Sequence, residues 1–366
     1  MKKVNVGIVG CGNISGIYLT NLTGCFSDIV NVVAVCDLIP DKALEAQKKY
    51  GIPKAYFTDE EIMADEEIEL ILNITTPDQH CPVNLMALAA GKHAYCEKPL
   101  AICRADGEKQ VALAKEKGLL LGGAPDTFMG GGIQTCRKLI EDGWIGDVVA
   151  VNASMRCHGH ESWHPNPAFY YETGGGPMFD MGPYYLTCLV NLIGAVKSVM
   201  AYTRVTFPTR LITSEPLRGT VIDVEVPTHI AGLMKFENGA VGTLTTSFDV
   251  YDDHQACIEV FGSRGSLLVP DPNGFGGPIR LLRADEHNYE DVPVVYGYQQ
   301  NSRGVGVADM ALALREGRRP RANCDQTFHV LDLMCAFHDS SDAGKEIPLR
   351  EGFRREPALS LERGIF

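Results

Sequence analysis

A lysine beside a turn proline could take part in proton and hydride chemistry. Lys98 lies in Cys96-Glu97-Lys98-Pro99-Leu100, directly after a short apolar run typical of a β-strand. Ligands of open α/β sheets bind beyond the carboxyl ends of the strands. A flexible ammonium there could hydrogen-bond a reacting hydroxyl and lower the pKa of a neighbouring acid. The alternative is a surface lysine with no role in chemistry.

A glycine cluster, Gly174-Gly-Gly-Pro-Met-Phe-Asp180-Met-Gly182-Pro-Tyr184, is the second segment with chemical potential. Asp180, Tyr184 and Thr187 are spaced i, i+4 and i+7, which predicts that they share one helix face. A carboxylate at a helix start is stabilised by the helix dipole and could bind substrate hydroxyls, and the triple glycine would give a substrate access to it. The alternative is that Asp180 is an ordinary N-cap and Tyr184 an ordinary packed aromatic.

The segment Gly10-Cys-Gly12-Asn13-Ile14-Ser15 predicts a dinucleotide site. It directly follows a predicted strand and matches the fingerprint in which glycines permit a tight turn and a close approach of pyrophosphate, with Ser15 in the third glycine position. The next predicted strand ends at Asp37, 25 residues after Gly12, where a carboxylate can bind ribose hydroxyls and would repel a 2′-phosphate. We therefore predict NAD rather than NADP. The alternative is a simple tight turn with Asp37 as a helix cap.

Two patterns of elements must position these segments. In the first third of the chain, β-branched runs alternate with Ala-, Leu-, Lys- and Glu-rich stretches, which predicts right-handed crossovers and a parallel sheet. The predicted strands are residues 4–9, 30–36, 70–74, 94–96 and 119–121. After residue 125, a helix at 130–142 leads into a mainly β pattern with hairpin turns. Its predicted strands are 148–155, 199–207, 228–236, 240–246, 257–261 and 266–269, and helices at 305–315 and 326–338 are expected to close it.

These patterns predict an α/β protein of two domains. The first is a doubly wound Rossmann domain over residues 1–124, with a parallel sheet that binds NAD. The second, over residues 125–366, is an α+β domain with a large, mostly antiparallel open sheet that binds substrate and mediates oligomerisation.

A loop between the sheet and the glycine cluster is rich in histidine and aromatic residues. Carboxylates and imidazoles can form hydrogen bonds with pairs of hydroxyls, while aromatic rings stack on the C–H face of a sugar. The expected substrate contacts are Arg156, His158, Glu161, Trp163, His164, Tyr170, Asp180 and Tyr184. A competing interpretation is a metal site at His158, His160, Glu161 and His164, but their spacing is not that of a helical H-E-x-x-H motif, and we expect no metal.

The composition restricts the class of partner. The chain has 366 residues, 45% hydrophobic and 22% charged, which are values typical of globular domains. Its 33 basic and 46 acidic residues give a net charge of -13, which argues against nucleic acid and membrane surfaces as partners. The 12 cysteines are scattered singly, so we expect reduced thiols. Because no apolar run approaches the ~20 residues of a membrane span and no signal peptide is evident, we expect a soluble, cytoplasmic protein.

Several motifs together resemble the glucose-fructose oxidoreductase, inositol dehydrogenase and MocA family (Gfo/Idh/MocA). They are the fingerprint at residues 6–15, Thr76-Pro77 with His80, Glu97-Lys98-Pro99, and the triple glycine that leads to Asp180-x-Gly182. The resemblance covers nearly the whole chain and implies homo-oligomers. It implies that the NAD contacts include Thr75, Thr76, Pro77, His80, Glu97 and Lys98, beside the fingerprint residues and Asp37. Its catalytic constellation is a lysine, an aspartate and a histidine four residues later, and Lys98 and Asp180 match the first two.

Tyr184 stands where the family most often has that histidine. An unperturbed tyrosine, with a pKa of ~10, is a poor base at neutral pH, but a nearby Lys98 ammonium would lower its pKa. We therefore expect Lys98 and Tyr184 to act as a pair, with Asp180 orienting the hydroxyl.

The expected activity is NAD-dependent oxidation of a secondary hydroxyl of a pyranose or glycoside, with C3 as the preferred position. Three alternatives remain open at this stage: an inositol as the substrate, a glycosidase that uses NAD for a transient C3 oxidation and elimination, and a non-catalytic NAD-binding regulator of sugar metabolism.

Overall fold

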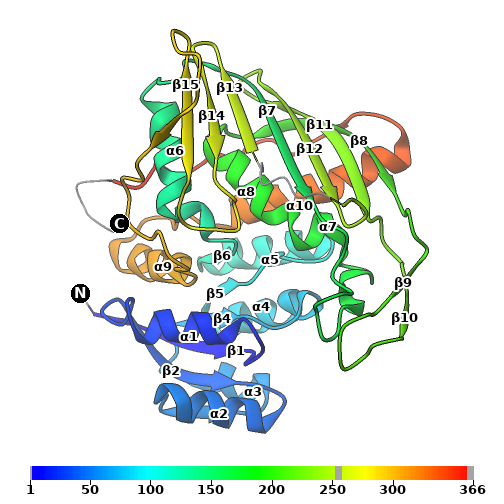
Figure 1. The fold of residues 1–366 in the computed structure, drawn as a ribbon. Coiled ribbons are helices and arrows are strands. Elements are labelled where there is room, and N and C mark those ends of the chain that lie inside the picture. Colours follow the sequence, from blue (N-terminus) through cyan, green and yellow to red (C-terminus); the bar gives the residue numbers. More distant parts are fainter. Residues whose placement is uncertain (1, 252–257, 361–366) are drawn as a thin grey trace. The chain divides into compact units, whose positions relative to one another are not determined.

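The contacts of the chain divide it into two units, each with its own sheet (Figure 1). The computed structural model describes residues 2–251 and 258–360. Among these, the first unit comprises 2–129 and 301–328, and the second comprises the remainder. The segment 301–328, which the sequence pattern placed in the second domain, therefore packs with the first unit.

The first unit is built on a six-stranded sheet in the order β3-β2-β1-β4-β5-β6, and every neighbouring pair is parallel. Its strands are β1 (Val4–Val9), β2 (Val30–Cys36), β3 (Lys54–Tyr56), β4 (Leu70–Asn73), β5 (His93–Cys96) and β6 (Leu121–Gly123). The strand order reverses between β1 and β4, which is the switch point where doubly wound sheets bind ligands. The predicted doubly wound parallel sheet is confirmed.

Six α-helices lie entirely within the described part of this unit: α1 (Ser15–Thr23), α2 (Pro40–Tyr50), α3 (Asp59–Ala64), α4 (His80–Ala89), α5 (Arg104–Lys117) and α9 (Val305–Glu316). Local residues explain their ends. Gly51 and Gly118 adopt left-handed conformations that terminate α2 and α5. Thr58 and Glu61 form a reciprocal capping box at the start of α3.

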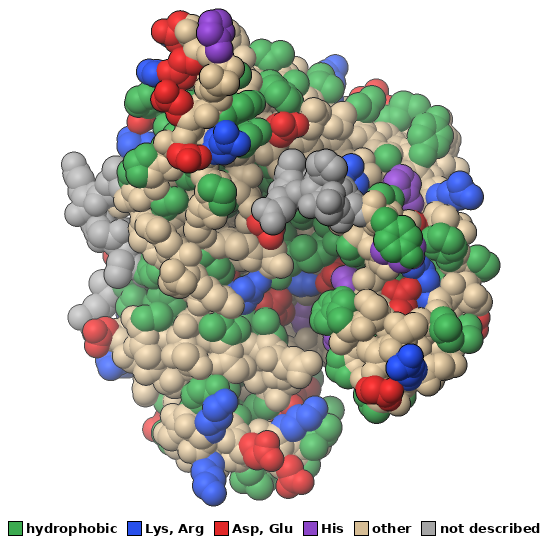
Figure 2. Space-filling model, viewed as in Figure 1, with side chains coloured by type: hydrophobic (Ala, Val, Ile, Leu, Met, Phe, Trp, Pro, Cys, Tyr) green, Lys and Arg blue, Asp and Glu red, His purple; other side chains and the backbone are tan. Residues whose placement is uncertain are grey.

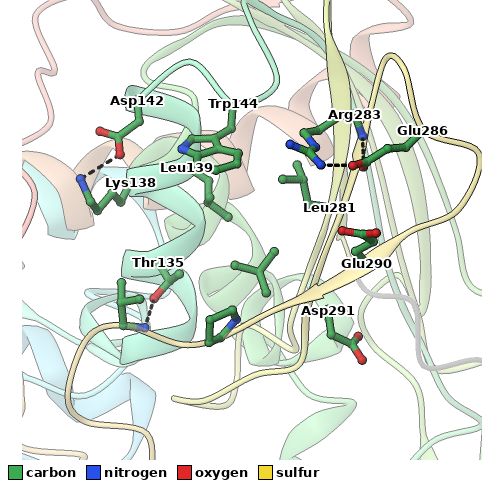
Figure 3. Close-up of a pocket in the computed structure, with 13 residues that line it drawn as sticks. Thr135, Lys138, Leu139, Asp142, Trp144, Leu281, Arg283, Glu286, Glu290 and Asp291 are labelled. Atoms are coloured by element: carbon green, nitrogen blue, oxygen red, sulfur yellow. Dashed lines mark hydrogen bonds and ion pairs between the residues drawn. The ribbon is translucent and has the colours of Figure 1, made fainter.

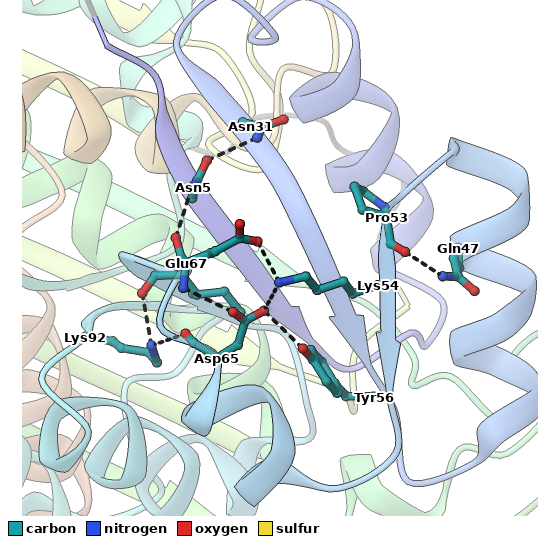
Figure 4. A network of polar contacts seen from close by, with 10 residues as sticks. Asn5, Asn31, Gln47, Pro53, Lys54, Tyr56, Asp65, Glu67 and Lys92 are labelled. Carbon is teal, nitrogen blue, oxygen red and sulfur yellow. Dashed lines mark hydrogen bonds and ion pairs between the residues drawn. The ribbon is translucent and has the colours of Figure 1, made fainter.

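The short strand β3, which the sequence pattern did not predict, is held largely by polar contacts (Figure 4). Lys54 Nζ lies 2.9 Å from Asp65 Oδ2 and 2.6 Å from Glu67 Oε2. The Tyr56 hydroxyl donates to the same Asp65 oxygen at 3.1 Å, and Lys92 Nζ donates to the Asp65 carbonyl at 2.7 Å. All three residues of β3 are only half-buried, so no hydrophobic period marks the strand.

Helix α9 joins the first unit through a buried carboxylate. Asp126 is 1% exposed and accepts backbone N–H groups from Gly304 at 2.8 Å and Gly306 at 3.1 Å. A Cβ atom added to Gly122 in β6 would lie 2.2 Å from the Ala322 carbonyl oxygen, so the segment after α9 packs directly on the strand. These long-range contacts explain why segment 301–328 belongs to this unit.

The basic residues of 315–321, at the end of α9 and directly after it, pair with carboxylates of the same unit. Arg318 and Arg321 both lie 2.7 Å from Asp309 Oδ1, and the Asp309 side chain is completely buried. Arg315 pairs with Glu69 at 2.7 Å. Charges of this stretch therefore stabilise the unit from within.

The second unit contains a nine-stranded sheet in the order β16-β15-β14-β13-β7-β12-β11-β8-β17. Its strands are β7 (Val148–Arg156), β8 (Val196–Arg204), β11 (His229–Phe236), β12 (Val241–Ser247), β13 (Ile258–Gly262), β14 (Gly265–Val269), β15 (Ile279–Arg283), β16 (Glu290–Val292) and β17 (Ile347–Pro348). Within the described part of this sheet, only β7 and β12 pair in parallel. The predicted large, mostly antiparallel sheet is confirmed, although residue 257 of one predicted strand lies outside the described residues.

Helices cover one face of this sheet (Figure 1). They are α6 (Gly131–Glu141), α8 (Gly182–Leu192) and the greater part of α10 (Cys324–Ala343), with the short α7 (Gly176–Asp180) beside β12. Strand β11 shows the alternation that this packing requires, because Ile230 and Met234 are buried while Leu233 is 51% exposed. A separate hairpin is formed by β9 (Thr209–Leu211) and β10 (Val221–Asp223).

The glycine cluster folds differently from its prediction. Asp180 is the last residue of α7, and Met181 both ends that helix and precedes α8. The prediction that Asp180, Tyr184 and Thr187 share one helix face is therefore wrong. The physical reason is Pro183, which lacks an N–H group and favours the first turn of a new helix over the interior of a continuous one.

Surface features of the described residues are consistent with the acidic composition. Figure 2 shows acidic and basic side chains interspersed over one face, without a continuous basic area on it. No helix within 2–251 and 258–360 is long and apolar enough to cross a membrane. The cysteines in these ranges are free thiols.

The buried Asp126 carboxyl predicts a pH-dependent contribution to stability. Burial raises the pKa of Asp126 to about 6, above the ~3.9 of an unfolded aspartate. The folded state therefore binds the proton more tightly, and this stabilisation is complete below pH ~4 and lost as the pH rises through 6. Between pH 4 and 7, urea unfolding should show the wild type losing stability relative to Asp126→Asn. Asp126→Ala should lose roughly 1–3 kcal/mol, because two buried N–H groups lose their acceptor. Identical pH profiles for the wild type and Asp126→Asn would contradict this account.

Candidate functional site

The loops that follow the parallel strands lie at one edge of the first sheet. Because the strands run in the same direction, the segments after β1, β2, β4 and β5 all leave from their carboxyl ends. These segments contain the predicted cofactor residues Gly10, Gly12, Asn13, Ile14, Ser15, Asp37, Thr75, Thr76, Pro77, His80, Glu97 and Lys98. The topology therefore brings the predicted cofactor residues to one edge.

The fingerprint loop is a tight turn pressed against the loop after β4. Gly10 has a φ of 99°, in the left-handed region that favours glycine, and its N–H donates to the Cys36 carbonyl at 2.8 Å. A Cβ at this position would lie 2.7 Å from the Ile74 carbonyl oxygen. At Gly12, in contrast, an added Cβ would meet no atom within 4 Å, so the backbone there faces open space.

Asp37 is fixed beside this loop by two backbone amides. Its Oδ2 accepts the Cys11 N–H at 2.8 Å, and its Oδ1 accepts the Ile39 N–H at 2.8 Å. Ile39 itself is the N-cap of α2, and no side chain caps that helix. Asp37 is thus not the helix cap of the alternative interpretation. Its carboxylate and burial also raise the pKa of the Cys11 thiol to about 12, burial being the larger cause, so this cysteine stays protonated.

Asn73 organises the loop after β4 from inside the protein. Its amide, fully buried, donates to the His80 carbonyl at 3.1 Å and to Asn84 Oδ1 at 3.0 Å. Its side-chain oxygen accepts the Thr75 hydroxyl at 2.6 Å. The His80 ring contacts the carbonyl oxygens of Pro99 at 2.6 Å and Thr75 at 3.2 Å. His80 therefore links the loops after β4 and β5 as a structural residue.

Glu97 plays a similar supporting part next to Lys98. Its carboxylate is buried and accepts the Tyr18 hydroxyl at 2.7 Å and the Lys98 N–H at 2.9 Å. Tyr18 belongs to α1, so this carboxylate connects the first helix to the loop that presents Lys98. Burial, together with Glu97, raises the pKa of Tyr18, which keeps that hydroxyl a hydrogen-bond donor.

The start of α1 fits a dinucleotide. This helix has no side-chain cap and no acidic residue in its first turn. Uncapped N–H groups at a helix N-terminus bind phosphate, and Gly12 leaves space for close approach. Ser15 is buried and donates its hydroxyl to the Gly12 carbonyl at 2.6 Å, so a small residue is needed there. The carboxylate of Asp37 beside the turn suits ribose hydroxyls.

In the second unit, a buried ion network anchors the loop that follows β7. Arg210 Nη1 lies 3.0 Å from Glu161 Oε1, and its Nη2 contacts Asp249 and the Phe248 carbonyl. Tyr171 donates its hydroxyl to Glu161 Oε2 at 2.5 Å. Both oxygens of Glu161 are therefore engaged within the protein. The sequence predicted Glu161 as a substrate contact and did not reveal Arg210 or Asp249, because nothing in their spacing links these distant segments.

Aromatic rings gather above this network, next to Asp180. His160 lies 4.1 Å from Tyr170, 4.6 Å from Phe248 and 5.3 Å from Trp163, measured between ring centroids. Its Nε2 lies 3.6 Å from Asp180 Oδ2. His164 lies 5.3 Å from both Trp163 and Tyr170. The structure thus brings together four of the predicted substrate residues: Trp163, His164, Tyr170 and Asp180.

Two other predicted substrate residues, Arg156 and His158, lie at the end of β7 and just after it. His158 stacks on Tyr251 at 3.7 Å and packs edge-on against Phe207. Arg156 is exposed, and strand alternation places it with Asn152 on the open face of the sheet.

Tyr184 and His329 occupy helices of the same unit. Tyr184 lies in the first turn of α8 and is 7% exposed. His329 in α10 accepts the Val196 N–H at 3.2 Å and stacks on Phe353 at 4.8 Å. Burial lowers the pKa of His329 to about 4, as expected for a neutral core histidine.

The glycine cluster serves packing around Asp180. A Cβ added to Gly175 would lie 2.5 Å from the Phe169 carbonyl oxygen, and Gly176 has a φ of 77° and would place a Cβ 3.0 Å from the Pro227 carbonyl. These contacts are with the protein's own backbone. The glycines therefore let α7 start close to the aromatic loop.

The described residues contain no group of three or more His, Cys, Asp or Glu side chains arranged to hold a metal ion. They do contain a pocket of about 400 Å³ at another place, between α6 and the β15–β16 hairpin (Figure 3). Leu139, Trp144 and Leu281 line it, with the ion pairs Lys138–Asp142 and Arg283–Glu286 at its rim. None of the predicted site residues lines this pocket.

Comparison with known proteins agrees with this arrangement. A family profile described as "Oxidoreductase family, NAD-binding Rossmann fold" matches residues 4–123, and one described as "GFO/IDH/MocA C-terminal domain" matches residues 133–268. Trans-1,2-dihydrobenzene-1,2-diol dehydrogenase of Mus musculus is 30% identical over 72% of this chain and 73% of that protein. Myo-inositol 2-dehydrogenase of Thermotoga maritima is 25% identical over 73% of this chain and 75% of that protein.

The fold recurs in solved structures. Levoglucosan dehydrogenase in complex with NADH superimposes with a TM-score of 0.83 over 96% of this chain and all of that one, at 18% identity. Together with the family profiles, and with a nucleotide edge whose loop, carboxylate and helix start suit NAD, the comparisons lead to one assignment. The chain belongs to the Gfo/Idh/MocA family, and it is an NAD-dependent oxidoreductase.

Proposed function

We propose that this enzyme oxidises a secondary hydroxyl of a pyranose, most favourably a glycoside at C3, and passes the hydride to NAD. The observation that carries the proposal is the Asp180 carboxylate beside the rings of His160, Trp163 and Tyr170. A carboxylate binds hydroxyls and aromatic rings bind C–H faces, and a polyhydroxylated ring presents both. The names of the dihydrodiol and inositol dehydrogenases among its relatives support a polyol substrate.

The proposed catalytic residues are Lys98, Asp180 and Tyr184. The bound nicotinamide would accept the hydride. Loss of hydride from a carbinol carbon requires removal of the hydroxyl proton, and Tyr184 is proposed to accept it. Lys98 would stabilise the negative charge on the reacting oxygen and lower the pKa of the Tyr184 hydroxyl. Asp180 would orient the reacting hydroxyl.

The substrate contacts proposed are the ones that gather in the aromatic cluster: Trp163, His164, Tyr170 and Asp180. Trp163 is 60% exposed, so its ring is available to stack on a sugar. Glu161 is proposed as the residue that positions the loop, since Arg210 and Tyr171 use both of its oxygens. Arg156 and His158 are proposed to contact the outer part of a larger glycoside.

We further propose that the protein forms a homo-oligomer through the open face of the nine-stranded sheet. The apolar side chains of Met200, Tyr202, Leu233 and Val241 are exposed there by 38%, 67%, 51% and 48%. Exposed apolar patches of this kind mark association surfaces in soluble proteins. A cytoplasmic location is also proposed, and the free thiols of the described cysteines support it.

A substrate panel tests the proposed activity. Methyl glucopyranosides, aryl glucosides, free glucose and myo-inositol would be incubated with the enzyme and NAD, with NADH followed by absorbance and products by chromatography. We expect NADH and a 3-keto-glycoside in equal amounts. Free aglycone without net NADH would show the NAD-assisted glycosidase instead, and a preference for myo-inositol would reject the glycoside. No NADH and no product from any polyol would contradict the proposed function.

A double-mutant cycle tests the Lys98 and Tyr184 pair. Tyr184→Phe should lower kcat roughly 10²- to 10⁴-fold, which is the usual contribution of a general base. It should also abolish the rise in rate with pH that accompanies deprotonation of the base. Lys98→Ala should lower kcat by a comparable factor. If the two residues act as a unit, the double variant should be little worse than either single one. Undiminished turnover of Tyr184→Phe with an unchanged pH profile would leave Lys98 or Asp180 as the base.

Light scattering tests the oligomer. Leu233→Glu places a charge in the exposed patch and should reduce the molar mass to that of the monomer, 39.9 kDa. Leu44→Glu, at a 45% exposed position in α2, is the matched control and should not change the mass. A wild-type protein that is monomeric, or an oligomer that persists in Leu233→Glu, would contradict the proposed interface.

A further inference from the structure

His160 is held rigidly in the aromatic cluster, although the sequence assigned it no role in substrate binding. It is 9% exposed. Tyr170, Phe248 and Trp163 pack around its ring, and its backbone N–H donates to the Tyr171 hydroxyl at 3.3 Å. The position of this imidazole is therefore determined by packing on three sides.

Both ring nitrogens of His160 lack a hydrogen bond within the described part of the chain. Most buried polar groups are hydrogen-bonded, because an unpaired one destabilises the folded state. The nearest carboxylate is Asp180, whose Oδ2 lies 3.6 Å from Nε2, which is too far for a direct hydrogen bond. The neighbouring Glu161 carboxylate offers no alternative, because Arg210 and Tyr171 occupy it.

The separation of Nε2 and Oδ2 suits an oxygen atom bound by both. One oxygen can lie at a hydrogen-bond distance of ~2.8 Å from both of two atoms that are 3.6 Å apart. Because Nε2 is buried, neighbouring side chains must shift to admit that oxygen. A hydroxyl group is the matching ligand, since it accepts one hydrogen bond while it donates another. It would accept from the Nε2–H of His160 and donate to Asp180.

Other charged groups around His160 leave this arrangement intact. Burial lowers the pKa of His164, and the proximity of His160 lowers it further, so the His164 ring is neutral near pH 7. His164 Nδ1 accepts the Asn166 N–H at 3.1 Å. The Asp180 carboxylate, 3.6 Å from Nε2, is an anionic group beside this ring.

We propose that His160 and Asp180 together bind the hydroxyl next to the reacting carbinol of the substrate. The proposal rests on the proposed function, in which Asp180 also orients the reacting hydroxyl. A carboxylate has two oxygens and can accept from two adjacent hydroxyls. His160 thus makes the enzyme specific for a vicinal diol. In a glycoside oxidised at C3, the hydroxyl that His160 binds is the one at C2 or C4.

The test combines substitutions of His160 with deoxy substrates. The probes are methyl glucopyranoside and its 2-deoxy and 4-deoxy analogues. With the wild type, loss of one of these hydroxyls should lower kcat/KM roughly 10- to 100-fold, the effect of losing one or two hydrogen bonds. His160→Phe preserves the ring packing, and it should lower kcat/KM for the full substrate by a similar factor while abolishing the discrimination against that deoxy analogue.

Two amide variants separate the role of Nε2 from packing. The terminal nitrogen of Gln lies near the position of Nε2 and that of Asn near Nδ1, so His160→Gln should recover discrimination and His160→Asn should not. His338→Phe is the matched control, because His338 is also partly buried with an unbonded Nε2 but lies in α10. It should leave kcat/KM and discrimination unchanged. Should His160→Phe fail to fold, the comparison of Gln with Asn decides the question.

A binding measurement separates this inference from the proposed function. Calorimetric titration of the same three sugars into NADH-loaded enzyme requires no turnover. The inference is supported if His160→Phe binds the full substrate more weakly than the wild type does, while both proteins bind the deoxy analogue equally. This holds even if no NADH forms. Full discrimination in His160→Phe, equal behaviour of the Gln and Asn variants, or no binding of any of these sugars would overturn it. Absence of NADH with every polyol overturns the proposed function alone.

Discussion

The buried ion network around Arg210 is the interaction on which the candidate substrate site depends. The loop after β7 has almost no regular secondary structure of its own, apart from one turn at Ala168–Tyr170. Arg210 connects it, through Glu161, to Asp249 at the end of the sheet, and the side chains of Arg210 and Asp249 are only 5% and 4% exposed. Removal of one partner would leave an uncompensated charge in the protein interior, which commonly costs 3–5 kcal/mol. The network therefore fixes the loop in a single arrangement.

The consequence of this anchoring is a rigid set of rings beside a carboxylate. Tyr171 binds Glu161 and also receives the His160 N–H, so the chain on both sides of the aromatic cluster is tied to the same group. Asp180 reaches the cluster because Gly175 and Gly176 allow the start of α7 to touch the backbone of Phe169 and Pro227. When the side chains that contact the substrate are held rigidly by further hydrogen bonds, the site can distinguish similar polyols by the hydrogen bonds that each polyol makes.

Most of the fold could be predicted from the sequence because most strands of the two sheets are apolar and at least half-buried. β1 and β2 were predicted with their observed bounds, since burial on both faces produces continuous β-branched runs. β3 was missed because its side chains are half-buried and held by Lys54 and Tyr56. The assignment of segment 301–328 to the first unit could not be predicted either. It depends on contacts, such as that of Asp126 with Gly304, that join residues far apart in the chain.

The site could be predicted only in part, and for the same reason. The fingerprint turn is a local feature, so the roles of Gly10 and Ser15 in packing followed from spacing alone. The function of Glu161 depends on Arg210, which lies 49 residues away. Residue type suggested a substrate contact, whereas the fold uses the carboxylate as a support. His160 illustrates the reverse case, since only the structure shows that its buried nitrogens are unbonded and that Nε2 lies near Asp180.

The central claim is that a secondary carbinol of a sugar gives its hydride to NAD. The most direct measurement uses methyl glucopyranoside deuterated at C3, with mass spectrometry of the recovered cofactor. We predict one deuterium in the reduced nicotinamide and a slower turnover than with the unlabelled sugar. Reduced cofactor without deuterium would place the oxidation at another carbon, and absence of reduced cofactor would contradict the claim altogether.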